Sequence, residues 1–287
     1  MMRGLHTPVR AIRRRVFKEV AQLGFKADED TLLADMEAIP YAIVNEDSEK
    51  YRESVYRARA IVRERLRLAM GLSLRPENKP VHLTAGVEAS NISEKYYEPP
   101  LMQVIPSACE SCEENKYEVS NICKGCLAHP CQEVCPKDAI SMVNGRSYID
   151  QEKCIKCGKR KSVCPYDAIA KKERPCQKAC GVNAIKSDKM GRAYIDNEKC
   201  VSCGMCMVSC PFGAISYKSQ IFQLARALSE GENVIAESAP AFVGQFGDNI
   251  TPRNIKAALR ELGFSEVYEV ALGADIGAIA EAHHYVD

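Results

Sequence analysis

The stretch "CVSCGMCMVSCP", residues 200–211, decides how the middle of this chain folds. Its four cysteines follow the spacing C-x2-C-x2-C-x3-C-P. The short x2 gaps let a loop wrap an iron–sulfur cube, and the cysteine before the proline starts a helix that reaches across to a second cube. We therefore expect this region to bind iron–sulfur clusters of the 4Fe-4S type.

The cysteine content of the whole chain supports this interpretation. All 15 cysteines of the 287 residues lie between Cys109 and Cys210. An odd number fits a complete disulfide set poorly, and dense, regularly spaced cysteine in a cytosolic chain indicates metal binding. Zinc is the rival metal because its tetrahedral sites also use C-x2-C pairs. The complete run at residues 200–211 and its duplication favour iron–sulfur clusters.

The composition of the chain limits which partners and which cellular compartment we expect for it. The formal net charge of +1 gives no global field for nucleic acid or for a membrane surface. No apolar run is long enough to span a membrane, and the N-terminus lacks the apolar core of a signal peptide. We expect a cytoplasmic protein that binds neither nucleic acid nor membrane.

The cysteine region contains an internal repeat. "CPKDAISMVNGRSYIDQEKCIKCG" begins at Cys135, and "CGVNAIKSDKMGRAYIDNEKCVSCG" begins at Cys180. Each is preceded four positions earlier by another cysteine and followed by "CPYDAI" or "CPFGAI". The repeat predicts two ferredoxin-like units, one after the other, with "RSYID" and "RAYID" as strands of small hairpins.

Cluster groupings follow from a rule for such units, in which the fourth cysteine of each run ligates the other cluster. The opening run of the second unit has only two of its four cysteines. Cys109 and Cys112, the pair left over, are assigned to it by elimination. The predicted groups are Cys123, Cys126, Cys131 and Cys164 for the first site, Cys135, Cys154 and Cys157 for the second, Cys109, Cys112, Cys176 and Cys210 for the third, and Cys180, Cys200, Cys203 and Cys206 for the fourth.

The second site lacks one thiolate. In "CIKCGKRKSVCP", residues 154–165, the third cysteine position holds Arg160. Its guanidinium stays protonated and has no lone pair for iron. We expect a three-iron or labile cluster, or a four-iron cluster with an exogenous ligand, and a more easily reduced one in either case. Because burying an unpaired cation is costly, Arg160 is predicted to point to solvent. A single-base change is the alternative explanation.

Residues 1–100 predict a helical N-terminal segment followed by a connecting wrap rich in Pro, Asn and Ser. In "YRESVYRARAIVRERLRLAMG", residues 51–71, Val55, Val62, Leu66 and Ala69 recur at helical spacing. The charged residues between them predict a solvated helix face. A docking face for an acidic redox partner is the alternative.

After Tyr217 the pattern changes to alternating strands and helices. "NVIAES" and "SEVYEVAL" predict strands, and Thr251, Pro252 and Gly263 mark the start and end of the helix between them. Such alternation is typical of a parallel α/β layer. The fold class is therefore α+β, with the helical segment at 1–100, tandem ferredoxin-like units at 101–217 and the beginning of a parallel layer at 218–287.

Several segments resemble FeFe-hydrogenases. "SAPAFVGQFG" and "NIKAALRELGFSEVYEVALGADIGAIAEA" are similar to the opening of that family's catalytic domain. "MRGLHTPVRAIRRRVFKEV", "CLAHPC" and "CVSCGMCMVSCPFGAI" resemble its monomeric group B branch. The resemblance implies electron flow between a ferredoxin-type partner and a catalytic H-cluster. The family's H-cluster ligands are cysteines further along the domain, and none follows Cys210, so no catalytic residue is predicted.

The sequence thus predicts the iron–sulfur electron-relay portion of an FeFe-hydrogenase that is inactive alone. Its expected partner is a ferredoxin-type or other redox protein. The alternative is a stand-alone polyferredoxin-type carrier, or an electron-transfer subunit of another oxidoreductase. A zinc-stabilised interaction protein is the third possibility.

Overall fold

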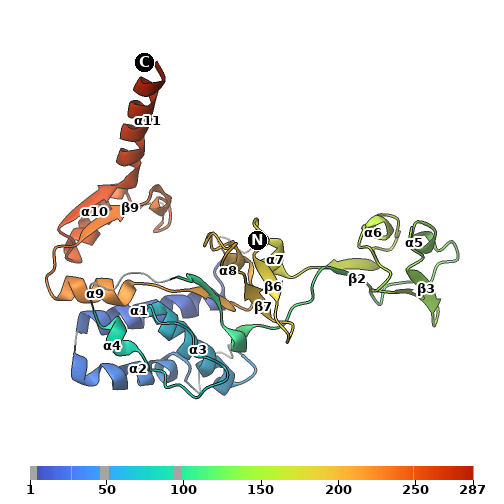
Figure 1. The fold of residues 1–287 in the computed structure, drawn as a ribbon, viewed down its shortest axis with the longest axis horizontal. Helices are drawn as coiled ribbons and strands as arrows, with labels where there is room; N and C mark the ends of the chain where they lie inside the picture. The colour runs from blue at the N-terminus through green and yellow to red at the C-terminus, as the bar shows by residue number, and fades with distance from the viewer. Residues whose placement is uncertain (1–4, 27, 46–51, 93–98, 248, 287) are drawn as a thin grey trace. The chain divides into compact units, whose positions relative to one another are not determined.

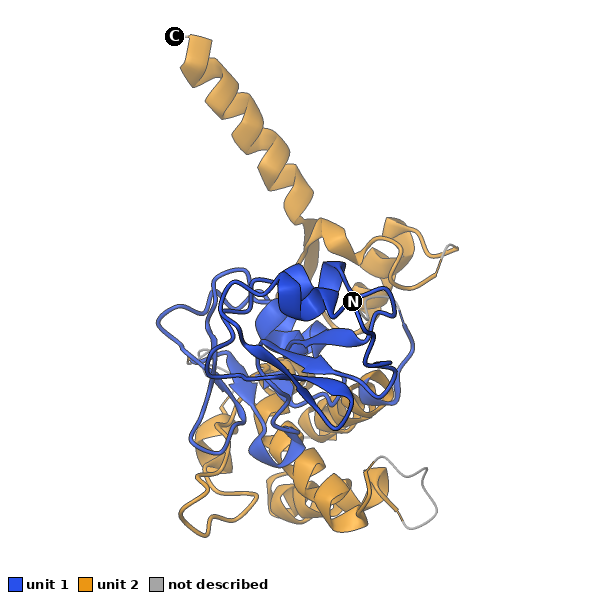
Figure 2. Cartoon of the chain, turned by 90° about the vertical axis from the view of Figure 1, so that its right-hand side faces the viewer, with its two compact units in different colours: residues 1–9, 100–217 blue, residues 10–99, 218–287 orange. Residues whose placement is uncertain are grey.

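The computed structural model describes residues 5–26, 28–45, 52–92, 99–247 and 249–286 (Figure 1). The chain divides into two compact units, shown in different colours in Figure 2. Residues 1–9 and 100–217 form one unit, and residues 10–99 and 218–287 form the other. None of the described helices has the length and apolar character needed to cross a membrane.

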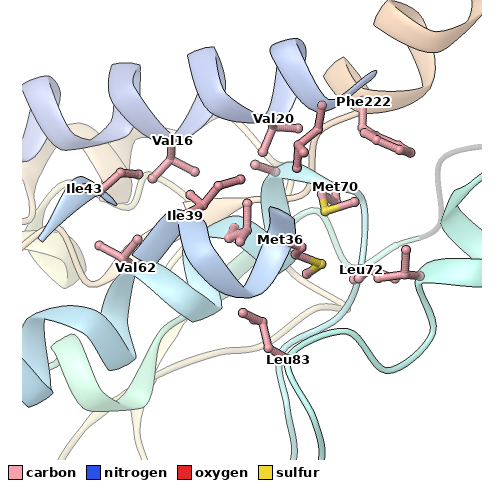
Figure 3. Close-up of a cluster of buried hydrophobic side chains, with 14 of the residues drawn as sticks. Val16, Val20, Met36, Ile39, Ile43, Val62, Met70, Leu72, Leu83 and Phe222 are labelled. Atoms are coloured by element: carbon pink, nitrogen blue, oxygen red, sulfur yellow. The ribbon is translucent and has the colours of Figure 1, made fainter. Parts of the chain in front are cut away.

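The helical unit is built from amphipathic helices. They are α1 (Pro8–Lys26), α2 (Glu29–Ile43), α3 (Val55–Ala69), the short α4 (Val87–Ser90) and α9 (Ile221–Ser229). Asp28 caps α2 by accepting hydrogen bonds from two backbone N–H groups, and Ser54 caps α3 in the same way with one. The apolar faces meet in one buried core, which includes Val20, Met36 and Phe222 (Figure 3). The helical N-terminal segment predicted from sequence is confirmed.

A glycine sets the close approach of α1 and α9. A Cβ atom added at Gly24 would lie 2.7 Å from both the Ala225 Cβ and the Phe222 carbonyl oxygen. Those distances are too short for non-bonded atoms, so a larger residue at position 24 would push the two helices apart. The segment after the cysteine region is thereby packed into the N-terminal helices.

The predicted solvated face of α3 is wrong. Glu64, Arg65 and Arg67 are 8%, 2% and 6% exposed. Arg67 donates hydrogen bonds to three backbone carbonyls of residues 73–85, and Glu64 pairs with Arg75 at 2.6 Å. The connecting wrap has few partners for its own carbonyls, so charged side chains of α3 satisfy them and become covered.

The C-terminal residues form the predicted parallel layer. Strand β9 (Ile235–Ser238) pairs in parallel with β10 (Glu266–Glu269), with η2 (Pro240–Phe242) and α10 (Pro252–Glu261) between them. Thr251 and Asn254 form a capping box at the start of α10. The last helix, α11 (Val270–Val286), begins where the predicted second strand was expected to continue. The alternation of strand and helix is confirmed.

The cysteine-containing unit consists of two-stranded sheets and one-turn helices. Two hairpins, β3 (Ile140–Val143) with β4 (Arg146–Ile149) and β6 (Ile185–Ser187) with β7 (Ala193–Ile195), contain the strands predicted at "RSYID" and "RAYID". Strand β1 (Met102–Val104) pairs with β8 (Ile215–Tyr217), and β2 (Lys116–Val119) pairs with β5 (Ile169–Lys172). Along the chain, both strands of the second pair lie between the two strands of the first. The first repeat is therefore inserted within the second. The short helices are η1 (Pro106–Ala108), α5 (Pro130–Glu133), α6 (Lys159–Ser162), α7 (Pro175–Lys178) and α8 (Met205–Ser209).

Candidate metal centres

Four of the five C-x-x-C segments make the same backbone turn, and the fifth, residues 203–206, leads into α8 instead. Residues other than glycine rarely adopt positive φ, because the left-handed region places Cβ near the next carbonyl. The third residue of each of these four segments has positive φ: 46° at Ser111, 57° at Lys156, 55° at Ser202, and 58° at Gly125, where glycine adopts it freely. The pair Cys109 and Cys112, which the sequence could assign only by elimination, thus has the same local shape as the other three.

A second turn recurs after the cysteine that opens each "AI" segment. The residue three positions later has positive φ, at Asp138, Asp167, Asn183 and Gly213. These are residue types that tolerate the left-handed region. The next residue is alanine in all four turns, and in three of them its backbone N–H donates to the cysteine sulfur. The donor-to-sulfur distances are 3.3 Å for Cys135, 3.2 Å for Cys180 and 3.3 Å for Cys210.

The cysteines predicted for the first site line one hollow of about 330 Å³, which is partly open to solvent. They are Cys123, Cys126, Cys131 and Cys164. The Ser147 hydroxyl lies 3.3 Å from the Cys131 sulfur. Burial raises the pKa of Cys123, but N–H donors of Ser147 and Gly125 outweigh it, and the pKa falls below its ordinary value. Hydrogen bonding thus prepares this sulfur to be a thiolate ligand.

The cysteines predicted for the third site line a second hollow, of about 320 Å³. They are Cys109, Cys112, Cys176 and Cys210. The backbone N–H of Ala193 donates to the Cys109 sulfur at 3.3 Å. Ala193 is the repeat counterpart of Ser147, so Cys109 has the place in the second unit that Cys123 has in the first. Burial, reinforced by the nearby Cys210, raises the pKa of Cys176 to about 12, and the charge of Arg174 offsets only part of this rise.

The four cysteines of the fourth site also lie close together. Cys206, on α8, is buried, and this burial raises its pKa to about 11. The backbone N–H of Met207 opposes this rise, and the charges of Cys200, Cys203 and Cys180 add to it. Cys180 and Cys200 pack against the same buried cluster that contains Cys206. Gly204, with φ of 74°, turns the chain into α8 immediately after Cys203.

The second site differs from the other three. Cys135 and Cys154 belong to one buried cluster, and Cys157 is exposed. Arg160 is only 2% exposed, and its Nη2 donates to the Cys135 sulfur at 3.6 Å. The prediction that Arg160 points to solvent is wrong, because the sulfur provides a partner for the guanidinium. The flanking Lys159 and Lys161 are exposed.

The charge state of Cys135 agrees with this pairing. Burial raises its pKa, but N–H donors of Lys137 and Ala139 and the charge of Arg160 together bring the pKa below its ordinary value. Cys135 is therefore favoured as a thiolate, opposite a guanidinium. The Arg160 Nη1 is buried and has no hydrogen-bond partner among the described residues.

Comparison with known protein families gives three separate matches. Residues 123–174 match an LdpA Fe-S cluster-binding domain, residues 193–216 a 4Fe-4S binding domain, and residues 232–287 the C-terminal domain of the iron only hydrogenase large subunit. Among curated proteins, Ferredoxin 7Fe of Hydrogenibacillus schlegelii is 42% identical over 53 residues, which are 18% of this chain and 68% of the ferredoxin. The chain is an FeFe-hydrogenase-like iron–sulfur protein of the ferredoxin family.

Longer matches cover smaller shares of the relatives. An uncharacterized ferredoxin of Methanocaldococcus jannaschii is 32% identical over 99 residues, 28% of this chain and 63% of the ferredoxin. Electron transport protein HydN of Escherichia coli K12 is 35% identical over 71 residues, 24% of this chain and 41% of HydN. The chain thus spans less than two thirds of the length of these relatives. The resemblance to FeFe-hydrogenases is confirmed, and the group B assignment stays a prediction.

A four-iron cluster needs four thiolate ligands, and the four cysteine groups differ in how well they supply them. The first, third and fourth groups fit a four-iron cube, because four thiolates with N–H donors lie around one space. The second group does not fit, because it has three cysteines and a buried guanidinium. Among the described residues, no three His, Cys, Asp or Glu side chains gather where a single metal ion would sit.

Sequence reasoning missed Arg174, which ties two parts of the third site together. Its guanidinium is 3% exposed and donates to the Cys112 carbonyl at 3.0 and 2.8 Å and to the Gly191 carbonyl at 2.8 Å. It stands directly before Pro175-Cys176, as His129 stands before Pro130-Cys131 in the first repeat. That repeat position is the signal that could have identified it. His129 itself is the left-handed residue before α5.

Proposed function

We propose that this chain is the electron-relay portion of an FeFe-hydrogenase. It would pass electrons between a ferredoxin-type partner and an H-cluster whose ligands are not among these residues. The observation that carries the proposal is the order of parts along one chain. Four cysteine groups with shared turn geometry lie at residues 109–210, and the hydrogenase C-terminal domain match follows at residues 232–287.

The proposal assigns each part of the chain a role. Residues 1–100 form a helical support, residues 101–217 hold the cysteine groups, and residues 218–287 begin the hydrogenase catalytic domain. The proposed metal ligands are the twelve cysteines of the first, third and fourth groups, and Cys135, Cys154 and Cys157 are the three cysteines of the incomplete second group. No cysteine follows Cys210, so the proposal assigns these residues no catalytic group and no hydrogenase activity of their own.

Bound clusters supply reversible one-electron storage, with potentials set by thiolate ligation, hydrogen bonds to sulfur and burial. The chain's own residues set the last two. Backbone N–H groups of Ala139, Ala184, Ala193 and Ala214 donate to cysteine sulfurs and stabilise the thiolate form. Cys176 and Cys206 are buried, which removes water from their side of each site.

The test is anaerobic reconstitution with iron and sulfide. We expect abundant iron and acid-labile sulfide, almost no zinc, reducible four-iron clusters, and electron exchange with a reduced ferredoxin. Protein that takes zinc in place of iron, or clusters that no ferredoxin-type partner reduces, would contradict the proposal. The matured protein is expected neither to evolve dihydrogen from reduced viologen nor to oxidise it.

A second function is favoured by the relatives, which are ferredoxins and electron transport proteins. It is a polyferredoxin-type electron carrier, or an electron-transfer subunit of another oxidoreductase, in which residues 218–287 have another use. Sequencing the transcript beyond the codon for Asp287 separates the two. In-frame cysteine motifs support the hydrogenase relay, and a stop codon supports the carrier.

A further inference from the structure

The second and fourth sites have the same local fold, which makes them a matched pair within one chain. In both, a C-x-x-C turn with positive φ leads to a glycine with positive φ, at Gly158 (82°) and Gly204 (74°). In both, a one-turn helix follows directly. Arg160 is the second residue of α6, and Cys206 is the second residue of α8. These two side chains therefore leave the backbone at equivalent positions.

Both residues are buried: Arg160 is 2% exposed and Cys206 is 7% exposed. They differ in length, because a guanidinium lies several bonds beyond the place of a cysteine sulfur. In the fourth site, a cube has to fit between Cys206 and its partner Cys180. In the second site, the Arg160 side chain crosses the equivalent space and ends 3.6 Å from Cys135, the counterpart of Cys180. The side chain occupies the volume that a cluster would need.

The positive charge of Arg160 is compatible with a position among cysteine thiolates. Thiolates around an iron–sulfur core face a cation, and the guanidinium presents a cation to the same thiolates. An unpaired buried guanidinium would be strongly unfavourable, but pairing with the Cys135 sulfur offsets part of that cost. Its Nη1 is buried and remains without a partner among the described residues.

We propose that Arg160 fills the second site and takes the place of its cluster, so that the chain holds three clusters rather than four. This inference rests on the proposed cysteine groups. The first unit then has one cluster, ligated by Cys123, Cys126, Cys131 and Cys164. The second unit keeps two adjacent clusters, and it is the part of the chain in which an electron can step from one cluster to another within a ferredoxin-like unit.

The test begins with the unmodified full chain, reconstituted anaerobically. Iron and acid-labile sulfide should correspond to three four-iron cubes. Mössbauer and electron paramagnetic resonance spectra should show four-iron species alone. A three-iron signal, a site-differentiated four-iron cluster or iron for four cubes would overturn the proposal. Because this measurement needs no variant, it holds even if a substitution impairs folding.

Variants at matched positions sharpen the test. Arg160→Cys should raise iron and sulfide by about one third, since a fourth cube gains its fourth thiolate. Lys161→Cys adds an exposed thiol at the next residue of α6 and should add no cluster. Cys206→Arg recreates the filled site in the second unit and should lower iron by about one third. An unchanged iron content in Arg160→Cys or in Cys206→Arg, or a gain in Lys161→Cys, would refute the assignment.

The result also separates this inference from the proposed function. A chain that binds zinc, or no reducible cluster at all, fails the proposed function. A chain with a fourth cluster at Cys135, Cys154 and Cys157 keeps that function and fails only the inference about Arg160.

Discussion

Replacing Arg174 with methionine should make the third cluster labile. The change keeps an apolar stem and removes the guanidinium that holds the carbonyls of Cys112 and Gly191. A buried carbonyl left without a donor costs about 1–3 kcal/mol. Both residues are only half-buried and water can partly replace the donor, so the lower end applies, about 2 kcal/mol for the pair. If loop opening exposes the cluster, release should become about 30-fold faster.

The assay is the rate at which an iron chelator removes iron from the anaerobic protein. We expect one cluster's worth of iron to leave in a new fast phase, with the remaining iron released at the original rate. Lys178→Met is the matched control, because Lys178 lies on α7, the helix that Arg174 precedes, but its side chain is 69% exposed and makes only a surface ion pair. An unchanged release rate in Arg174→Met would refute the role given to this residue.

The other predictions concern the turns that hold the ligands. Replacing both Cys109 and Cys112 with serine should remove about one cluster's worth of iron. Adding Arg174→Met to that variant should have no further effect on the rate of iron release. An undiminished iron content in the double serine variant would disprove the third group. Gly125→Ala should impair the first site, because its Cβ would lie 2.0 Å from the Gly145 carbonyl oxygen. In Gly145→Ala the added Cβ would meet no atom within 4 Å, so the variant should lose only the roughly 1–2 kcal/mol of unfolding free energy that left-handed backbone strain costs. Its losses of stability and of iron should therefore be smaller than those of Gly125→Ala.

The sequence predicted what depends on local spacing. The C-x-x-C periods anticipated four equivalent segments, and the "RSYID" and "RAYID" repeats anticipated β4 and β7. It failed where tertiary contacts decide. Arg67 is buried because carbonyls 6 to 18 residues away need donors, and Arg160 is buried because it reaches a sulfur 25 residues away. Neither partner can be identified from the residue's own neighbours in sequence.

The insertion of the first unit into the second leads to a last prediction about how the third site forms. Its ligands come from both sides of the insertion, and Arg174 bonds the Cys112 carbonyl across 62 residues. At the base of the insertion, Lys116 and Lys172 are antiparallel strand partners, so their Cα atoms lie about 5 Å apart. Removing residues 116–172 and joining the flanking ends with a short glycine link should therefore leave the two halves of the third site in place.

The shortened chain is expected to keep the third and fourth clusters and to lose every cluster of the first unit. The strand pair of β1 with β8 and the hairpin of β6 with β7 lie outside the deleted segment and supply its remaining framework. Iron for two cubes, falling to one when Cys109 and Cys112 are also replaced by serine, would support this order of assembly. Iron for a single cube in the shortened chain, despite a folded hairpin in its nuclear magnetic resonance spectrum, would mean that the first unit is needed to build the third site.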